Sequence, residues 1–321
     1  MSELVGKIKS KNLFDSKAKQ FFSTISGLII LMIIFSLNNE NFLTTANLLN
    51  VAVQTTPILL IAMGQTYVLI TGGIDLSIGS NIALAGVTTA IFIKAGMPIS
   101  LAILLGLAVT AGVGVLNGVM IAYGKLPPFI VTLGTMTTVR GITLTMTQGI
   151  PISGLPEAFN NIGIAKSFGI PNPIFIMIIF ALIFGFILSK TRTGRYTYAL
   201  GSNFEAARLS GVNAHKTLIK VYMFSGILAG IAGLVMAARI ISAPPTAGMG
   251  YELDAVASSV IGGASTMGGE GTIFGTVVGA FIIGVLRNGL NLMGVSPFIQ
   301  QIVIGVVIIA AVFFDKLRHS K

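Results

Sequence analysis

The residue types that most often carry chemistry in enzymes are nearly absent from this sequence. Its 321 residues include no cysteine and only two histidines, one of which, His319, lies within the last three positions. The lack of cysteine excludes a disulfide framework, a thiolate metal site and a cysteine nucleophile. One histidine in the body of the chain cannot make a histidine metal site. We therefore predict no catalytic residue and no metal site in this chain.

Glycine-rich phosphate-binding motifs are also missing. The stretch nearest to a P-loop, from Gly118 to Lys125, has five residues between its glycines instead of four. Leu126 then stands where the motif needs a Ser or Thr for magnesium. We therefore expect this chain to bind no cofactor, so that any ATP and Mg²⁺ must be used by another protein.

One carboxylate lies in a glycine-rich stretch that we call the glycine turn (residues 71–77). The stretch contains Gly72, Gly73, Asp75 and Ser77 and directly precedes an apolar run. We favour a structural interpretation, in which Asp75 caps or begins the following helix. The alternative is that these four residues act in translocation or gating, and the sequence leaves both interpretations open.

A second candidate is a short polar stretch, residues 203–211, which we call the capped segment. Asn203 fits an N-cap, Glu205 lies in the first turn, where a helix favours negative charge, and Gly211 fits the C-terminal cap. The pattern predicts about two helical turns, roughly 10 Å long. Its two alanines would fit closely into a groove on a partner and its arginine could form a charge pair there, while a solvated loop helix is the alternative. The residues with a predicted docking role are Asn203, Glu205, Ala206, Ala207, Arg208 and Gly211.

The elements that must hold these residues are membrane spans. Hydrophobic residues make up 54% of the chain and charged residues 9%, whereas soluble domains have about 25% charged residues. Ten spans of about 20 residues use roughly 200 residues, which leaves too few for a separate soluble domain. The net charge of +10 is explained by basic loops on one side of a membrane, so we expect contact with lipid and not with nucleic acid.

Apolar runs separated by Gly, Pro and charged residues predict an all-α polytopic membrane protein with about ten transmembrane helices. The eighth run is too short to span alone, which indicates a broken or partly re-entrant element buried by its neighbours. The predicted spans are residues 21–37, 51–70, 78–93, 99–123, 129–148, 173–188, 218–241, 255–264, 273–287 and 298–314.

The distribution of Lys and Arg predicts the orientation of these spans. With a cytoplasmic N-terminus, fifteen of the 20 basic residues fall on inside segments, as the positive-inside rule requires. We therefore predict that both termini are cytoplasmic. The predicted organisation is a basic tail at 1–20, one transmembrane domain at 21–314 with a cytoplasmic loop at 189–220, and a C-terminal tail at 315–321.

Glycine, with 39 residues, is frequent in the apolar runs. Gly271, Gly275 and Gly279 follow one another at intervals of four, the spacing at which small residues let membrane helices pack closely. We interpret them as helix-packing residues, and a moving helix interface is the alternative.

Several motifs together resemble the monosaccharide ABC importer permease family. Glu205-Ala206-Ala207 followed by Gly211 resembles the coupling motif with which such permeases dock onto their ATPase. The similarity extends from about residue 40 to 314. The other motifs that carry it are residues 69–80, 193–201, 245–255 and 288–292.

The resemblance implies the ABC importer permease fold in the bacterial inner membrane. It implies a homodimer that works with a cytoplasmic ATPase subunit and an extracytoplasmic sugar-binding protein. The expected activity is import of a monosaccharide, with ribose as the expected sugar, by alternating access driven by ATP hydrolysis in the partner. The permease itself is then not an enzyme.

Two other functions are alternatives to an ABC importer permease. An ion-coupled secondary sugar transporter would place carboxylates in mid-span, whereas the acidic residues here map to tails and loops, apart from four near span ends. A lipid- or peptide-handling membrane enzyme would need clustered nucleophile, base or metal ligands at one depth. We favour the ABC permease over both. The four acidic residues near span ends are Asp75, Glu252, Asp254 and Glu270.

Overall fold

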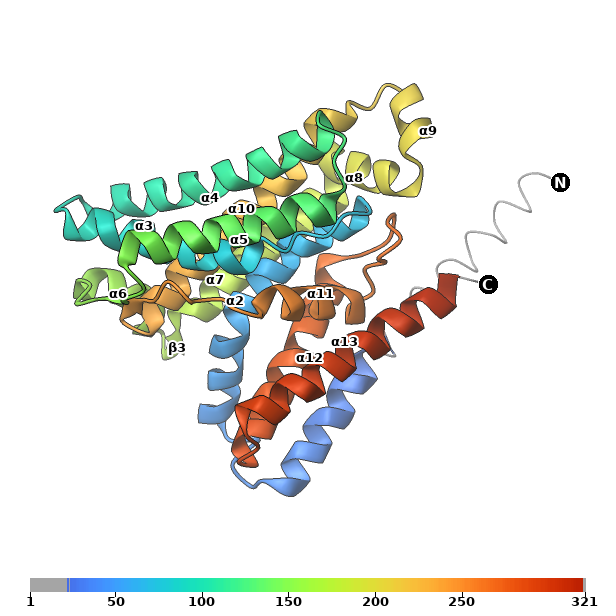
Figure 1. The fold of residues 1–321 in the computed structure, drawn as a ribbon. Coiled ribbons are helices and arrows are strands. Elements are labelled where there is room, and N and C mark those ends of the chain that lie inside the picture. The colour runs from blue at the N-terminus through green and yellow to red at the C-terminus, as the bar shows by residue number, and fades with distance from the viewer. Residues whose placement is uncertain (1–21, 23, 320–321) are drawn as a thin grey trace.

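The computed structural model describes residues 22 and 24–319 and is a bundle of helices (Figure 1). The predicted basic tail at 1–20 lies outside the described residues. The longer helices are Thr24–Asn38, α2 (Thr45–Ile70), α3 (Ile78–Lys94), α4 (Ile99–Ala122), α5 (Pro128–Thr147), α7 (Asn172–Lys190), α10 (Ala214–Arg239), α12 (Ile273–Leu292) and α13 (Pro297–His319). The shorter elements are α6 (Glu157–Ile164), α8 (Arg192–Ser202), α9 (Phe204–Leu209), α11 (Tyr251–Ile261) and the two-residue strands β1 (Ile152–Ser153), β2 (Lys166–Ser167), β3 (Ile170–Pro171) and β4 (Ser242–Ala243).

Each of the predicted spans overlaps one of these helices. In the described part of the chain, seven helices are long and apolar enough to cross a membrane, namely α2, α4, α5, α7, α10, α12 and α13. Thr24–Asn38 and α3 are apolar but shorter. The chain is thus a helical membrane protein with seven candidate spans, while the count of about ten and the side of each terminus stay predictions. Helix α13 also continues through residues 315–319, where we expected the C-terminal tail to begin.

The predicted eighth span is a short helix, α11, of 11 residues. A turn-rich stretch at 244–250 leads into it, because Pro244 and Pro245 cannot donate helical hydrogen bonds and Gly250 adopts φ +81°. Before this stretch, β4 pairs with β1, with Ala243 opposite Ile152. A turn-rich entry followed by a short buried helix agrees with the expected broken element.

Helix α10 forms the centre of the packing, with α2, α3 and α4 against it. From Val221 to Ala238 its residues are nearly all apolar and mostly buried, as expected for a helix surrounded by others, whereas His215, Lys216 and Lys220 in its first turns are exposed. Figure 1 shows α8 and α9 at one end of this bundle and α6 with β3 at the other, while α12 and α13 lie beside it. The capped segment and the loop after α5 therefore lie at opposite ends of the molecule.

Candidate functional site

The capped segment forms helix α9, and both predicted caps are confirmed. The Asn203 side-chain oxygen accepts a hydrogen bond from the Ala206 N–H at 2.9 Å. At the other end Gly211 has φ +84°, a left-handed conformation that favours glycine. The Gly211 N–H donates to the Arg208 carbonyl at 3.1 Å. The helix itself has six residues.

Helix α9 exposes both charged and apolar side chains. Glu205 and Arg208 form an ion pair at 2.8 Å with side chains 65% and 61% exposed, and surface pairs of this kind contribute little to stability. Leu209 is 81% exposed and Phe204 42% exposed. Sequence reasoning did not single out these two apolar residues, although a large apolar residue on each side of a charged pair in a polar loop is the signal that would have found them.

The two alanines of the capped segment lie in different environments. Ala207 is buried against Leu200 and Ala214, whereas Ala206 is exposed. Ala207 therefore anchors α9 to α8 and α10. Of the expected alanine pair, only Ala206 is free to contact a partner in this conformation.

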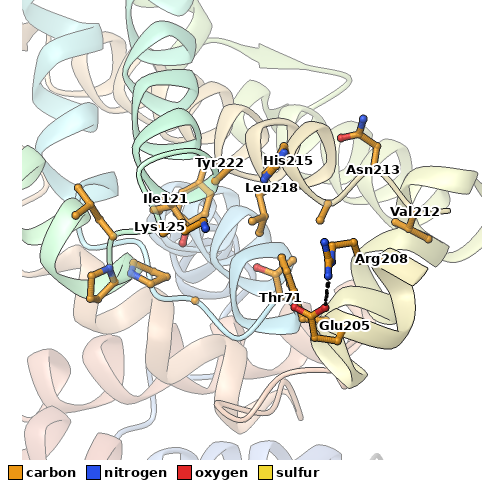
Figure 2. Close-up of a pocket in the computed structure, with 17 residues that line it drawn as sticks. Thr71, Ile121, Lys125, Glu205, Arg208, Val212, Asn213, His215, Leu218 and Tyr222 are labelled. Atoms are coloured by element: carbon orange, nitrogen blue, oxygen red, sulfur yellow. Dashed lines mark hydrogen bonds and ion pairs between the residues drawn. The ribbon is translucent and has the colours of Figure 1, made fainter. Parts of the chain in front are cut away.

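A large cleft of 920 Å³ opens beside the capped segment. Its walls come from α9, from the connection between α4 and α5 and from the beginning of α10, and Gly73 of the glycine turn also lines it. Figure 2 shows the Glu205–Arg208 pair on one side of the cleft and Lys125 with Tyr222 on the other. The cleft thus joins the capped segment to the glycine turn, which lies far from it in the sequence.

Backbone contacts join α8 to two glycine-rich loops at the same end of the bundle. The Gly269 N–H donates to the Ile70 carbonyl at 2.8 Å, and Gly201 lies so close to that carbonyl that a Cβ would overlap with it. The Tyr198 hydroxyl donates to the Gly271 carbonyl at 2.6 Å. Burial raises the pKa of Tyr198 to about 12, so the phenol stays a neutral donor. We call the meeting point of Ile70, Gly201 and Gly269 the glycine junction.

The glycine turn holds Asp75 completely buried. One carboxylate oxygen accepts from the Ser77 N–H at 2.9 Å and from the Ser77 hydroxyl at 2.6 Å. Ser77 is the N-cap of α3 and no side chain caps that helix, so Asp75 forms a local turn before α3 and the predicted cap is wrong. The other oxygen accepts from the Ser225 hydroxyl of α10 at 2.7 Å. The carboxylate therefore fixes the turn that leads into α3 and also ties that turn to the central helix.

A chain of buried hydrogen bonds continues from the glycine turn. The Asn117 amide of α4 donates to the Ser77 hydroxyl at 3.0 Å, and the Thr135 hydroxyl of α5 donates to Asn117 at 2.7 Å. Nearby, Gly73 lies close to the Tyr222 hydroxyl oxygen, and Gly72 adopts φ +79°. The structure thus brings the four glycine-turn residues together, and what they do there stays a prediction.

Two arginines inside predicted spans bind groups that lie far from them in the sequence. Arg140 of α5 donates to the carbonyls of Pro245 and Ala247 at 2.6 and 2.9 Å, so it holds the turn-rich stretch before α11. Arg287 of α12 pairs with Asp254 of α11 at 2.6 Å. No local pattern marks these pairs, because 105 and 33 residues separate the partners.

The predicted packing glycines lie where α12 crosses α11. A Cβ on Gly275 would overlap with the Gly262 carbonyl, and one on Gly279 with the Ser258 carbonyl. Gly271 differs from the other two, because it precedes the helix and adopts φ +151°. The spacing of four predicted that Gly271 packs as the other two glycines do, but it lies in the loop that contains Gly268 and Gly269.

Comparison with known proteins places these features in a family. Residues 47–312 match the family described as branched-chain amino acid transport system / permease component. No solved structure shows significant similarity to the chain.

Curated relatives cover nearly the whole chain. The ribose import permease protein RbsC of Bacillus subtilis (strain 168) is 46% identical over 314 residues, which are 97% of this chain and 98% of that protein. RbsC of Escherichia coli (strain K12) is 45% identical over 300 residues, 92% of this chain and 94% of that protein. The D-allose transport system permease protein AlsC of Escherichia coli (strain K12) is 42% identical over 306 residues, 95% of this chain and 93% of that protein.

These matches agree with the helical membrane architecture and with a transport role that needs no catalytic residue. The family match covers most of the chain, and the relatives share more than two fifths of their residues with it. The chain therefore belongs to this family of transport-system permease components, the membrane subunits of ABC importers.

Proposed function

We propose that this chain is the permease of a monosaccharide importer and that its sugar is ribose. The observation that carries the proposal is the identity of 45–46% over nearly the full length to ribose import permeases of two different bacteria. Identity falls to 42% for the D-allose permease and 38% for the L-arabinose permease AraH of Escherichia coli (strain K12). This order favours ribose over the other two sugars.

The proposed mechanism is alternating access powered by a separate cytoplasmic ATPase. An extracytoplasmic binding protein delivers the sugar, and the ATPase moves the capped segment, which faces the cytoplasm. The exposed charged and apolar side chains of α9 suit a docking surface. Because α8 contacts the glycine junction, movement of α8 and α9 would reach the glycine turn and through it α3 and α10.

A second copy of the permease completes the proposed transporter. Its support is the resemblance of the motifs to ABC importer permeases, which implies a homodimer. Sedimentation or native mass spectrometry of the purified complex checks the subunit count, and one permease per two ATPase sites would contradict the homodimer.

Transport in proteoliposomes tests the sugar and the energy source together. The permease is reconstituted with the ATPase and binding protein from the same organism, and uptake of labelled ribose is measured with ATP inside. We expect ATP-dependent ribose uptake that unlabelled allose and arabinose inhibit less than unlabelled ribose does. Uptake of another sugar in preference to ribose would refute the substrate assignment while leaving the importer class intact.

An ion-coupled carrier is the second candidate, because Asp75 and Asp254 are completely buried in the bundle and buried carboxylates are common in proton-coupled transport. The same proteoliposomes separate the two. A carrier would take up sugar without ATP when a proton or sodium gradient is imposed, whereas an ABC permease would not.

A further inference from the structure

A small polar pocket lies in the half of the molecule opposite to the capped segment. It has a volume of 280 Å³ and lies between α2, the end of α10, α11, α12 and α13. Arg239, in its wall, is the last residue of α10, and a 26-residue helix places it about 39 Å from the end that follows the capped segment. The polar residues that line the pocket are Gln54, Arg239, Tyr251, Arg287, Asn291 and Gln300.

The polarity of this pocket is unexpected for its surroundings. Gln54 and Arg287 lie within α2 and α12, which are both candidate membrane spans. Amide and guanidinium groups at membrane depth are costly unless they face a polar cavity, and they usually mark a path for substrate or ions.

Several polar groups at the pocket are incompletely bonded. Arg287 donates to Asp254, but its Nε and the second Asp254 oxygen are buried with no hydrogen-bond partner among the described residues. Arg239 is half-buried and Asn291 is exposed, and neither side chain makes a hydrogen bond within the described part of the chain. Buried polar groups are normally bonded, so the unbonded Arg287 Nε and Asp254 oxygen indicate that the pocket receives a hydrogen-bonding ligand.

The kinds of group present favour a neutral polyol over an anion. The carboxamides of Gln54, Asn291 and Gln300 each offer donors and an acceptor, as sugar hydroxyls do, whereas an anion needs donors only. Asp254 offsets the charge of Arg287, which leaves Arg239 as the one unpaired charge among the described lining residues. The Tyr251 ring, 5.9 Å from the Arg287 guanidinium carbon, adds an apolar face to the polar groups.

We propose that this polar pocket is a transient binding site for a neutral monosaccharide. The proposal rests on the proposed function and adds the place where the sugar first meets the permease, on the side away from the ATPase. The partial bonding of its groups suits brief binding, because the Arg287–Asp254 pair holds the wall together when no sugar is present.

Leucine substitutions at the pocket test this site in the reconstituted importer. Asn291→Leu removes an amide that has no partner in the described structure, and Gln300→Leu removes one that donates to the Val295 carbonyl at 2.9 Å. Gln301→Leu is the matched control, since Gln301 is exposed on the same helix and does not line the pocket. We expect sugar uptake per ATP hydrolysed to fall at least tenfold in the two pocket variants and to stay within twofold of wild type in the control.

Saturation-transfer NMR on the permease alone in nanodiscs adds a readout that does not depend on coupling. Ribose at millimolar concentration should receive saturation from wild type and from Gln301→Leu but not from Asn291→Leu, and ribose 5-phosphate should receive none. Saturation of the phosphate in place of ribose, no saturation of either, or an Asn291→Leu variant with wild-type uptake and binding would each overturn the proposal.

The same experiments distinguish failure of the site from failure of the proposed function. If the wild-type complex imports no monosaccharide, the proposed function is wrong. If the wild type imports sugar and both pocket variants import it equally well, the importer stands and the pocket is not its sugar site.

Discussion

At the scale of single residues, Asp75 has two connections that the sequence could not separate. Its bonds to Ser77 form a local turn just before α3, whereas its bond to Ser225 joins the α2–α3 turn to the central helix. A local structural role was predictable because the Ser77 bonds join neighbours two residues apart. The Ser225 bond was not, because the partners are 150 residues apart in sequence and meet only when the helices pack.

Replacement of Asp75 separates a structural role in the turn before α3 from a role in gating. Asp75→Ala removes the acceptor for buried donors, each of which costs about 1–3 kcal/mol when left unbonded, so we expect a clear loss of heat stability. Asp75→Asn keeps one acceptor oxygen for Ser77 and offers an amide to the Ser225 hydroxyl, so stability and transport should stay near wild type. Size-exclusion profiles after heating and sugar uptake measure the two properties. A tenfold transport loss in a heat-stable Asp75→Asn protein would instead support gating.

Charge reversal in the capped segment tests its docking role. Glu205 and Arg208 form an exposed pair worth about 0–1 kcal/mol, so Glu205→Lys and Arg208→Glu should fold and insert normally. Each should lower co-purification with the ATPase and sugar-stimulated ATP hydrolysis, because each changes the charge presented to the partner.

The double variant Glu205→Arg with Arg208→Glu sharpens this test. It restores the pair within α9 but reverses the pattern that a partner would meet. Continued loss of ATPase binding is expected. Recovery to wild-type binding would show that the pair acts only within the helix. It would support the alternative interpretation, in which the capped segment is a solvated loop helix.

At the scale of elements, the helices were predictable and their contacts were not. Long apolar runs mark helices such as α4 and α7 without reference to the rest of the chain, and the two caps of α9 are local as well. The glycine junction joins residues 70, 201 and 269, and no periodicity shows which of many glycines will meet. Gly271 shows the same limit, because its spacing is helical but its backbone is not.

Crowding of the α11–α12 contact should impair assembly. Gly279→Leu places a side chain where the Ser258 carbonyl lies, and overpacking of this kind costs typically about 1–3 kcal/mol or more. Gly112→Leu is the control, since a Cβ there meets no atom within 4 Å. We expect heat stability to fall only for Gly279→Leu, with membrane insertion retained in both. Equal stability of the two variants would contradict the packing interpretation.

Adding one methyl group at Gly201 tests whether the glycine junction transmits movement to the membrane spans. Gly201→Ala forces α8 away from the Ile70 carbonyl, so we expect less sugar moved per ATP while ATPase binding through α9 persists. Gly134→Ala, where an added Cβ meets no atom within 4 Å, is the matched control. Wild-type coupling in Gly201→Ala would mean that movement reaches the spans by another route.

At the scale of the whole molecule, the orientation in the membrane stays a prediction from charge. Ser153 in β1 and Ser202, the last residue of α8, are both exposed and lie at opposite ends of the bundle. Because the chain has no cysteine, a single cysteine at either position is a clean reporter. An impermeant thiol reagent added outside cells should label Ser153→Cys and spare Ser202→Cys. The reverse pattern would invert the predicted topology.

The glycine junction has a mechanical consequence for the assembled transporter. Its contacts are made by main-chain atoms of Ile70, Gly201 and Gly269, and main-chain atoms have no rotamers that could absorb a displacement. Such a contact deforms little, so in the proposed mechanism it would transmit a movement of α8 and α9 to the end of α2 almost without loss. The number of sugar molecules imported per ATP hydrolysed should then stay nearly constant when temperature or membrane fluidity changes.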